Sequence, residues 1–164
     1  MRGKSGPAMA ATLPSKTAGL DPNDPPAMQL TLPGTADAVR RTLREIMTTD
    51  LLLGLSVNLR ASAEIVLAEV LNNIVEHAYA AHAGDIEIRL SACETGLCCT
   101  VVDRGAAMPG LFLPKGDLQS LGPTPDLPEG GFGWFLIRSL VTELHYHRAG
   151  GENRLSFLLC DEQS

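Results

Sequence analysis

Residues 69–79 read Glu69-Val70-Leu71-Asn72-Asn73-Ile74-Val75-Glu76-His77-Ala78-Tyr79. In a helix, Glu69, Asn73 and His77 would lie four residues apart and stack on one face. Asn72 and Glu76 flank that face, while the apolar residues of the stretch cover the opposite arc. A carboxylate can take a proton or orient a water molecule, and an amide oxygen can hold a hard cation such as Mg²⁺. The stretch therefore predicts a helix with one face in the core, whose other face carries either chemistry or only solvated polar groups.

The composition is that of a soluble globular domain. The chain has 164 residues, of which 45% are hydrophobic and 20% charged, and these values favour one domain with a substantial core over a disordered chain. The formal net charge of -6 argues against nucleic acid as a partner, because no stripe of Lys and Arg is present to neutralise phosphates. A protein partner or a metal-chelated nucleotide fits this charge better.

Cysteine usage and hydropathy indicate the compartment. Cys93, Cys98, Cys99 and Cys160 form no Cys-x-x-Cys pair and have no histidine at metal-binding spacing, which argues against zinc. We expect them to be small buried hydrophobic residues in a reducing compartment. No apolar run reaches the roughly 18 residues of a membrane span, and the first residues lack the apolar core of a signal peptide. These features predict a cytoplasmic protein with no membrane partner.

The order of the expected elements indicates an α+β fold. Residues 1–27 are expected to form a flexible leader, and residues 28–164 a single domain. The expected elements are a strand at 28–33, helices at 36–48 and from about 58 to 81, strands at 85–92 and 97–103, a long loop at 104–130, a helix at 132–142, and strands at 143–148 and 153–159 joined by a turn at 149–151. Asn58 or Ser62 is the expected N-cap of the long helix, after a linker or short turn at 51–57. This order predicts a two-layer α/β sandwich, with a mostly antiparallel sheet and the helices on one of its faces.

A second motif begins at the end of the strand predicted at 97–103. It reads Asp103-Arg104-Gly105-Ala106-Ala107-Met108-Pro109. An aspartate at this place can accept a hydrogen bond from the exocyclic amine of adenine, and Gly105 permits close approach by a flat ring. A guanine carbonyl would be repelled, so the carboxylate would select ATP over GTP. A simple turn is the alternative interpretation of Asp-x-Gly.

A third motif stands directly before an apolar helix pattern and reads Gly130-Gly131-Phe132-Gly133-Trp134-Phe135-Leu136-Ile137. Backbone amides at such a helix N-terminus form an anion site suited to phosphates, and glycines leave that site open. A hinge that starts a helix is the alternative interpretation. We expect Trp134 and Phe135 to belong to the core rather than to stack on a ligand.

Taken in this order, the three motifs resemble those of the Bergerat-fold ATPases (GHKL, histidine-kinase-like), the superfamily of histidine-kinase catalytic domains, gyrase and MutL. Within it, the chain is most similar to the anti-sigma-factor serine/threonine kinases. The resemblance covers roughly residues 28–160 and rests on Glu-x-x-x-Asn-x-x-x-His-Ala-Tyr, Asp-x-Gly-x-x-x-Pro and Gly-Gly-Phe-Gly-x-Phe-Leu-Ile. It implies the histidine-kinase-like ATPase fold, with ATP and Mg²⁺ as cofactors.

The resemblance also implies roles for particular residues. Glu69 would be the catalytic residue that orients or deprotonates the attacking group, and Asn73 would be the Mg²⁺ ligand. The residues implied in nucleotide binding are Asn73, His77, Asp103, Gly105, Gly131, Phe132 and Gly133. His77 takes a supporting position and is not a phosphoacceptor, and residues 108–129 resemble the mobile ATP lid.

The function that the resemblance implies is an Mg-ATP-binding serine/threonine kinase of the anti-sigma-factor type that regulates transcription. Its partners would be a sigma factor and/or an anti-anti-sigma antagonist protein whose Ser or Thr accepts the phosphoryl group. The family also makes a homodimer an expectation. Val39 and Leu43 of the first helix suit either such an interface or the core.

Few basic residues stand where phosphoryl transfer would need them. The lid offers only Lys115, and Arg104 and Arg138 are the other nearby candidates for the positive charge that a developing phosphoryl group requires. Kinase activity is therefore one interpretation, and an ATP-gated protein-binding regulator without kinase activity is the alternative. A nucleotide-free interaction domain that keeps the fold as a scaffold is a further alternative.

Overall fold

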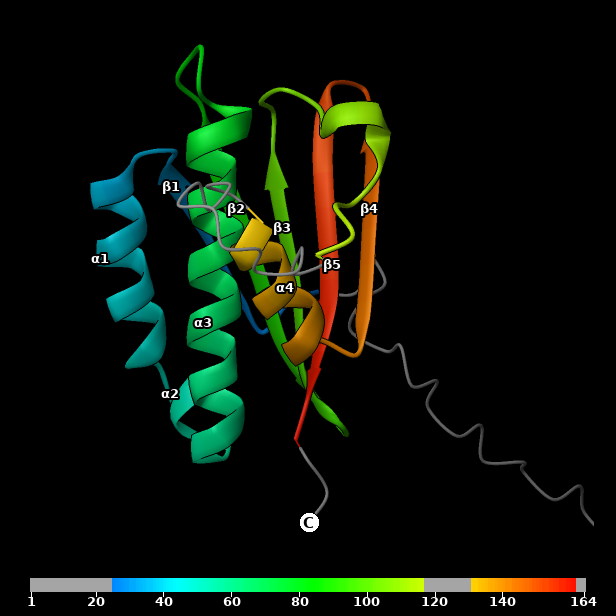
Figure 1. The fold of residues 1–164 in the computed structure, drawn as a ribbon. Coiled ribbons are helices and arrows are strands. Elements are labelled where there is room, and N and C mark those ends of the chain that lie inside the picture. The colour runs from blue at the N-terminus through cyan, green and yellow to red at the C-terminus, as the bar shows by residue number, and fades with distance from the viewer. Residues whose placement is uncertain (1–24, 117–130, 162–164) are drawn as a thin grey trace, which may run out of the picture.

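The computed structural model describes residues 25–116 and 131–161, which form a five-stranded antiparallel sheet with helices against one face (Figure 1). The strands are β1 (Met28–Pro33), β2 (Asp85–Cys93), β3 (Gly96–Asp103), β4 (Glu143–Ala149) and β5 (Glu152–Cys160), in the order β1-β2-β3-β5-β4. The helices are α1 (Ala36–Met47), α2 (Asp50–Leu53), α3 (Val57–Asn73), the π-helix η1 (Ile74–Ala78), the 3-10 turn η2 (Pro109–Leu111) and α4 (Gly131–Leu140). The predicted α+β sandwich of two layers is confirmed.

Two segments that the sequence singled out lie largely outside the described residues. They are residues 1–24 of the expected leader and residues 117–129 of the expected lid. The leader and the lid both stay predictions. Within 25–116 and 131–161, no helix combines the length and the hydropathy that crossing a membrane requires.

Alternation along the strands decides which face of the sheet is covered. In β2, Ile86, Ile88 and Leu90 are buried, while the residues between them are only partly buried. The three buried residues belong to the hydrophobic core beneath α1, α3 and α4. The register pairs Asp103 of β3 with Ile86 on one side and with Asn153 of β5 on the other. Paired residues of neighbouring strands point to the same face, so both polar side chains lie on the face covered by helices.

The long helix α3 begins directly after Ser56, whose hydroxyl accepts a hydrogen bond from the N–H of Leu59 at 3.1 Å. The prediction of Asn58 or Ser62 as N-cap is therefore wrong. The expected linker at 51–57 contains most of the short helix α2 and the first residue of α3. Because α2 turns the chain early, the long helix starts before either predicted cap.

A π-helical turn, η1, ends the helical segment that was predicted to reach about residue 81. The N–H of Tyr79 bonds to the carbonyl of Ile74 at 2.9 Å, five residues back. The Tyr79 hydroxyl donates to the carbonyl of Asp85 at 2.6 Å and accepts from the N–H of Arg104 at 3.0 Å. These bonds hold the ring between the start of β2 and the end of β3, so the chain cannot continue as a helix. Wider π turns of this kind are frequent at functional sites.

Helix α1 directs its apolar stripe into the core. Val39 is 2% exposed, and Leu43 is partly buried against the same core. Of the two interpretations of these residues, the core interpretation is the one that the packing supports. The homodimer stays a prediction, and Val39 and Leu43 no longer support it as interface residues.

The four cysteines, all within the described residues, form no disulfide. Cys98 and Cys99 are buried as expected, whereas Cys93 and Cys160 are only partly buried. Burial raises the pKa of Cys98 to about 12 and that of Cys99 well above its ordinary value. Both thiols are therefore protonated at neutral pH, as expected for small hydrophobic residues.

A two-residue turn joins β4 to β5. Gly150 and Gly151 have φ angles of 57° and 80°, in the left-handed region that tight hairpin turns require and that glycine adopts readily. The predicted turn included Ala149, which instead ends β4. The turn places Asn153 at the start of β5, paired with Asp103.

Candidate functional site

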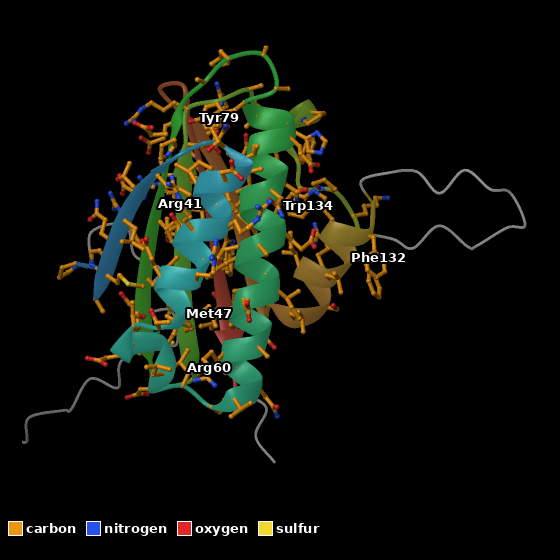
Figure 2. The ribbon with its side chains drawn as sticks, turned by 90° about the vertical axis from the view of Figure 1, so that its left-hand side faces the viewer. Arg41, Met47, Arg60, Tyr79, Phe132 and Trp134 are labelled. Carbon is orange, nitrogen blue, oxygen red and sulfur yellow. The ribbon has the colours of Figure 1, made fainter. Side chains whose placement is uncertain are left out.

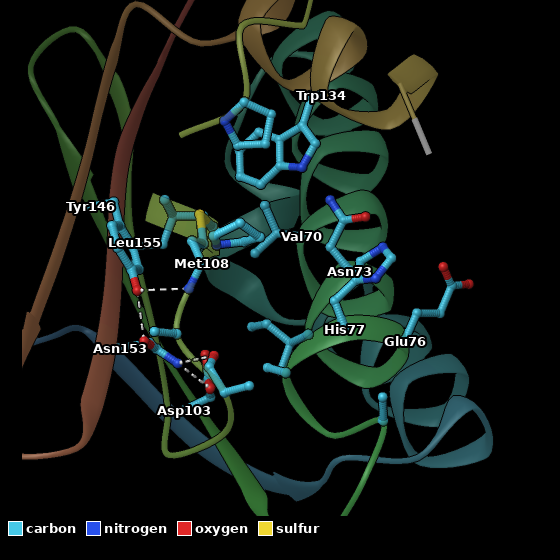
Figure 3. Close-up of a pocket in the computed structure, with 17 residues that line it drawn as sticks. Val70, Asn73, Glu76, His77, Asp103, Met108, Trp134, Tyr146, Asn153 and Leu155 are labelled. Carbon is cyan, nitrogen blue, oxygen red and sulfur yellow. Dashed lines mark hydrogen bonds between the residues drawn. The ribbon is translucent and has the colours of Figure 1, made fainter. Parts of the chain in front are cut away.

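A cavity of about 650 Å³ lies between the helix layer and the ends of the central strands (Figure 3). Side chains of α3 and η1 form one wall, and Asp103, Tyr146, Asn153 and Leu155 form the opposite wall. The loop after β3 and Trp134 of α4 complete the lining. Most lining side chains are apolar, so a flat and largely apolar ligand group would be covered there.

Asp103 lies at one end of this cavity and is 5% exposed. Its Oδ1 accepts hydrogen bonds from the N–H of Gly105 and from Nδ2 of Asn153, each at 2.8 Å. Within the described residues both bonds go to the same oxygen, which leaves Oδ2 as an acceptor for a ligand. The structure therefore places this predicted residue where it can receive a donor from the cavity.

Asn153 is a site residue that the sequence analysis missed. It is 5% exposed, and its Nδ2 donates both to Asp103 and to the carbonyl of Ala106, the latter at 3.0 Å. Its Oδ1 accepts from the Tyr146 hydroxyl at 2.7 Å and from Nη1 of Arg148 at 2.5 Å. The later inward positions of β5 are apolar, so a polar residue at the first inward position was the signal that could have found it.

Gly105 lies beside Asp103 as expected, but glycine is required there for a different reason. A Cβ at this position would collide with the carbonyl of Ala78 at the end of η1. The N–H of Ala106 bonds to that same carbonyl at 2.8 Å. Gly105 is not among the described residues that line the cavity. The close packing of the loop on η1 explains the glycine, and contact between Gly105 and a ligand stays a prediction.

Glu69, Asn73 and Gly133 meet away from Asp103, where α3 packs on α4. A Cβ on Gly133 would lie 2.5 Å from Oε2 of Glu69 and 3.9 Å from Oδ1 of Asn73, so α4 approaches both side chains closely at this residue. Asn73 lines the cavity, and its Nδ2 is buried without a hydrogen-bond partner among the described residues. Glu69 is partly buried beside it and is not among the described lining residues.

The remaining predicted residues divide between the cavity and the surface. His77 lines the cavity with an exposed side chain, and Glu76 lines it with a carboxylate that points away from the cavity (Figure 3). Phe132 is 61% exposed and points outward from α4 (Figure 2), whereas Gly131 is the first residue of that helix. Trp134 is 7% exposed and belongs to the core, as expected, but it also forms part of the cavity wall.

Positive charge is scarce along the cavity. The described lining residues include no lysine or arginine. Arg104 has a side chain that is 76% exposed and pairs with Glu152 at 3.0 Å. Arg138 donates to the carbonyl of Pro114 at 2.7 Å, and Lys115 is exposed. None of the three cations named by the sequence analysis lines the cavity.

The two ends of the cavity fit the predicted nucleotide and Mg²⁺. An apolar slot that ends on a carboxylate acceptor, Asp103, suits a purine ring with an exocyclic amine. Nδ2 of Asn73 is buried and has no partner within residues 25–116 and 131–161, so it suits a phosphate oxygen, because a buried donor without a partner is costly. The oxygen of the same amide is a hard ligand of the kind that Mg²⁺ takes.

Comparisons with known proteins agree with this geometry. A family model described as the histidine kinase-like ATPase domain matches residues 31–159. The serine-protein kinases RsbW of Bacillus thuringiensis (strain Al Hakam) and Bacillus cereus (strain AH820) are each 32% identical over 83 residues. These alignments cover 49% of this chain and 52% of each relative, so the chain spans about half the length of the curated relatives it matches.

A solved structure supports the fold alone. The RsbU and RsbW domains of Rv1364c from Mycobacterium tuberculosis match 84% of this chain and 33% of that chain, with 20% identity and a TM-score of 0.50. The match to the family model, by contrast, extends from β1 to β5 and includes both ends of the cavity. The predicted resemblance is thereby confirmed, and the chain belongs to the family of histidine kinase-like ATPase domains.

Proposed function

We propose that the protein binds Mg·ATP and acts as a serine/threonine kinase of the anti-sigma-factor type. The γ-phosphoryl group passes to a Ser or Thr hydroxyl of a small antagonist protein, and the partner is that antagonist and/or a sigma factor. One observation carries the proposal: one cavity has a buried carboxylate acceptor, Asp103, at one end, and at the other an amide, Asn73, whose Nδ2 is buried without a partner among the described residues. The serine-protein kinases among the relatives support the class of acceptor.

Asp103 holds the adenine end in this proposal. Its Oδ2 accepts a hydrogen bond from the exocyclic amine, while apolar lining residues such as Val70 and Leu155 cover the ring and exclude water. A buried acceptor selects for a donor on the ligand, because a carbonyl in the same place would leave two acceptors facing each other. The hydrogen bond at Asp103 therefore determines which nucleotide base is bound.

Asn73 and the start of α4 hold the phosphate end. Nδ2 of Asn73 donates to a phosphate oxygen, and its Oδ1 is the Mg²⁺ ligand. The first N–H groups of α4, from Gly131 to Gly133, have no acceptor within the helix and are available to phosphate oxygens. When bound, Mg²⁺ supplies the positive charge that stabilises developing negative charge on the phosphoryl oxygens.

Glu69 is the general base of the proposed reaction. Its Oε2 and the amide oxygen of Asn73 both lie near Gly133, and in the proposal Oε2 accepts the proton of an incoming hydroxyl. Because Glu69 is not among the described lining residues, nucleotide binding and phosphoryl transfer depend on different side chains. The two activities can therefore be separated by substitution.

The substitution Glu69→Gln tests the kinase proposal. Transfer of radiolabelled phosphate to an antagonist protein is expected to fall by about 100-fold or more, since general-base catalysis typically contributes that much. Binding of Mg·ATP, measured by calorimetry, is expected to change by less than about threefold. Glu64→Gln is the matched control, because Glu64 is exposed on the same helix. Equal loss of binding and transfer would show that Glu69 is structural.

A second candidate function is an ATP-gated protein-binding regulator that transfers no phosphate. The absence of lysine and arginine from the described lining residues favours it, because phosphoryl transfer needs positive charge on the phosphoryl oxygens. The phosphate-transfer assay on the wild type separates the two functions. Partner capture with and without ATP identifies the protein that binds. A calorimetric titration with Mg·ATP that releases no heat of binding would favour the nucleotide-free scaffold instead.

A further inference from the structure

We propose that Asn153 is a positioning residue that makes the cavity select a 6-amino purine, and that Tyr146 and Arg148 hold Asn153 in the orientation this requires. The inference rests on the proposed binding of a purine nucleotide at Asp103. It adds a specificity device on β4 and β5, two strands that none of the sequence motifs includes.

The amide of Asn153 can adopt only one orientation. Its Oδ1 accepts from two donors, the Tyr146 hydroxyl at 2.7 Å and Nη1 of Arg148 at 2.5 Å. Its Nδ2 faces acceptors, namely Oδ1 of Asp103 at 2.8 Å and the carbonyl of Ala106 at 3.0 Å. A reversed amide would set its oxygen against two acceptors and its nitrogen against Arg148, which can only donate, so at most the bond with the Tyr146 hydroxyl would survive.

The fixed amide decides which oxygen of Asp103 serves the cavity. Asn153 and the N–H of Gly105 both donate to Oδ1. The carboxylate therefore cannot turn to offer that oxygen elsewhere, and Oδ2 is presented as an acceptor in a constant place. A 6-amino group matches this acceptor, whereas a 6-oxo group in the same pose would face it as a second acceptor.

The side chains that hold Asn153 also hold the chain after Asp103. The Tyr146 hydroxyl accepts from the N–H of Met108 at 3.2 Å, and Nη1 of Arg148 donates to the carbonyl of Gly105 at 3.1 Å. The β4–β5 hairpin thus fixes the acceptor and the backbone beside it together. Such support of a recognition group by surrounding hydrogen bonds is what keeps its geometry selective.

The experiment compares Mg·ADP with Mg·IDP, whose base carries a 6-oxo group in place of the 6-amino group. Affinities for the full chain are measured by calorimetry and by the fluorescence of Trp134, the single tryptophan, which lines the cavity. The wild type is expected to prefer ADP by about 30-fold or more, as expected for a buried group left unpaired. In Asn153→Leu, which keeps a similar volume, this preference is expected to fall to about threefold. Tyr146→Phe, which removes only the hydroxyl, is expected to give an intermediate preference.

Thr100→Val is the matched control. The hydroxyls of Thr100 and Ser156 bond at 3.0 Å between β3 and β5, on the face of the sheet away from Asp103. This variant loses a hydrogen bond between the same two strands and is expected to keep the wild-type preference. A loss of folding would lower the affinities for ADP and IDP by the same factor. The ratio of the two affinities therefore reports how Asp103 is positioned and not how stable the protein is.

The outcomes separate the inference from the proposed function. If the wild type binds neither nucleotide, the proposed function fails and the inference falls with it. If the wild type prefers ADP and both variants keep the full preference, the inference is wrong while the proposed function stands. Equal wild-type affinity for ADP and IDP would also overturn the inference. Should Asn153→Leu not fold, Tyr146→Phe decides alone, because a hydroxyl deletion leaves the ring in place.

Discussion

The two ends of the cavity differ in how completely their polar groups are paired. At the Asp103 end, hydrogen bonds among the protein's own side chains join Asp103, Asn153, Tyr146 and Arg148. At the other end, the Nδ2 of Asn73 is buried without a partner among the described residues. A paired network is rigid and selective, whereas an unpaired buried donor costs stability until a ligand satisfies it. In the proposed nucleotide complex, the Asp103 end would therefore provide recognition, and the Asn73 end would be completed by its ligand.

Asp103→Asn should have the largest effect on nucleotide affinity. The amide can still accept from Asn153 and Gly105 with its oxygen, so the fold is expected to lose less than about 1 kcal/mol. Its nitrogen then faces the exocyclic amine with a donor instead of an acceptor. The affinity for Mg·ADP is expected to fall about 100-fold, as measured by calorimetry.

Asp85→Asn is the control for this change, because Asp85 is exposed at the start of β2. Its affinity for Mg·ADP should stay within about twofold of the wild type. An Asp103→Asn protein that binds as tightly as the wild type would remove Asp103 from the nucleotide site. The contrast in hydrogen-bond pairing between the Asp103 end and the Asn73 end would then have no counterpart in nucleotide binding.

Asn73→Leu should affect binding and stability in opposite directions. Removing an amide whose nitrogen is buried without a partner in the described part of the chain is expected to raise the free energy of unfolding by up to ~1 kcal/mol in the absence of nucleotide. The affinity for Mg·ATP is expected to fall about tenfold, because a phosphate donor and a metal ligand are lost together. Urea unfolding and calorimetry, each with Mg²⁺ and with a chelator, measure the two effects.

Removal of Mg²⁺ sharpens the same prediction. In the wild type, chelation of Mg²⁺ should lower the affinity for ATP but leave the affinity for adenosine unchanged. In Asn73→Leu, chelation should lower the affinity for ATP little further. Asn72→Leu is the control, since Asn72 is the exposed neighbour on the same helix, and it should alter neither quantity appreciably. A loss of stability in Asn73→Leu would mean that the native amide is satisfied, and the contrast between the two ends would disappear.

The sequence was sufficient for features that depend on local pattern. Alternation in β2 predicted the buried face of the sheet, and the four-residue spacing of Glu69 and Asn73 predicted that the two share one helix face, which in the structure is the face near Gly133. Asp103 could be singled out because it ends a predicted strand and stands two residues before Gly105. Each of these signals lies within about ten residues, and the periods of helix and strand express them directly.

Features that depend on residues far apart in the chain were missed. Asn153 bonds to Asp103 across 50 positions, and no local period reports a contact of that kind. The requirement for Gly105 arises from the carbonyl of Ala78, which only the folded chain brings close. The π turn before Tyr79 has the same origin, because the bonds that end the helix come from Asp85 and Arg104.

Tyr79→Phe should have the smallest effect on binding, since Tyr79 supports the framework between the two ends and does not line the cavity. The affinity for Mg·ADP should change by less than about twofold. Loss of the hydroxyl leaves the N–H of Arg104 and the carbonyl of Asp85 without their bonds. The free energy of unfolding at pH 8 should therefore fall by about 1–2 kcal/mol.

The pH dependence of this difference separates the hydroxyl from mere packing. Burial raises the pKa of Tyr79 above 10.0, and the nearby carboxylates of Asp103 and Asp85 raise it further, against the opposing bond from Arg104. Because the folded-state pKa is the higher one, the stability that the neutral phenol contributes is complete below pH 10 and is lost as pH rises above it. The wild type should thus lose stability faster than Tyr79→Phe between roughly pH 9 and pH 11, while Cys98 and Cys99 contribute equally to both proteins. Urea unfolding at both pH values measures the gap, and a gap that stays constant would mean that the phenol has the same pKa in the folded and the unfolded protein.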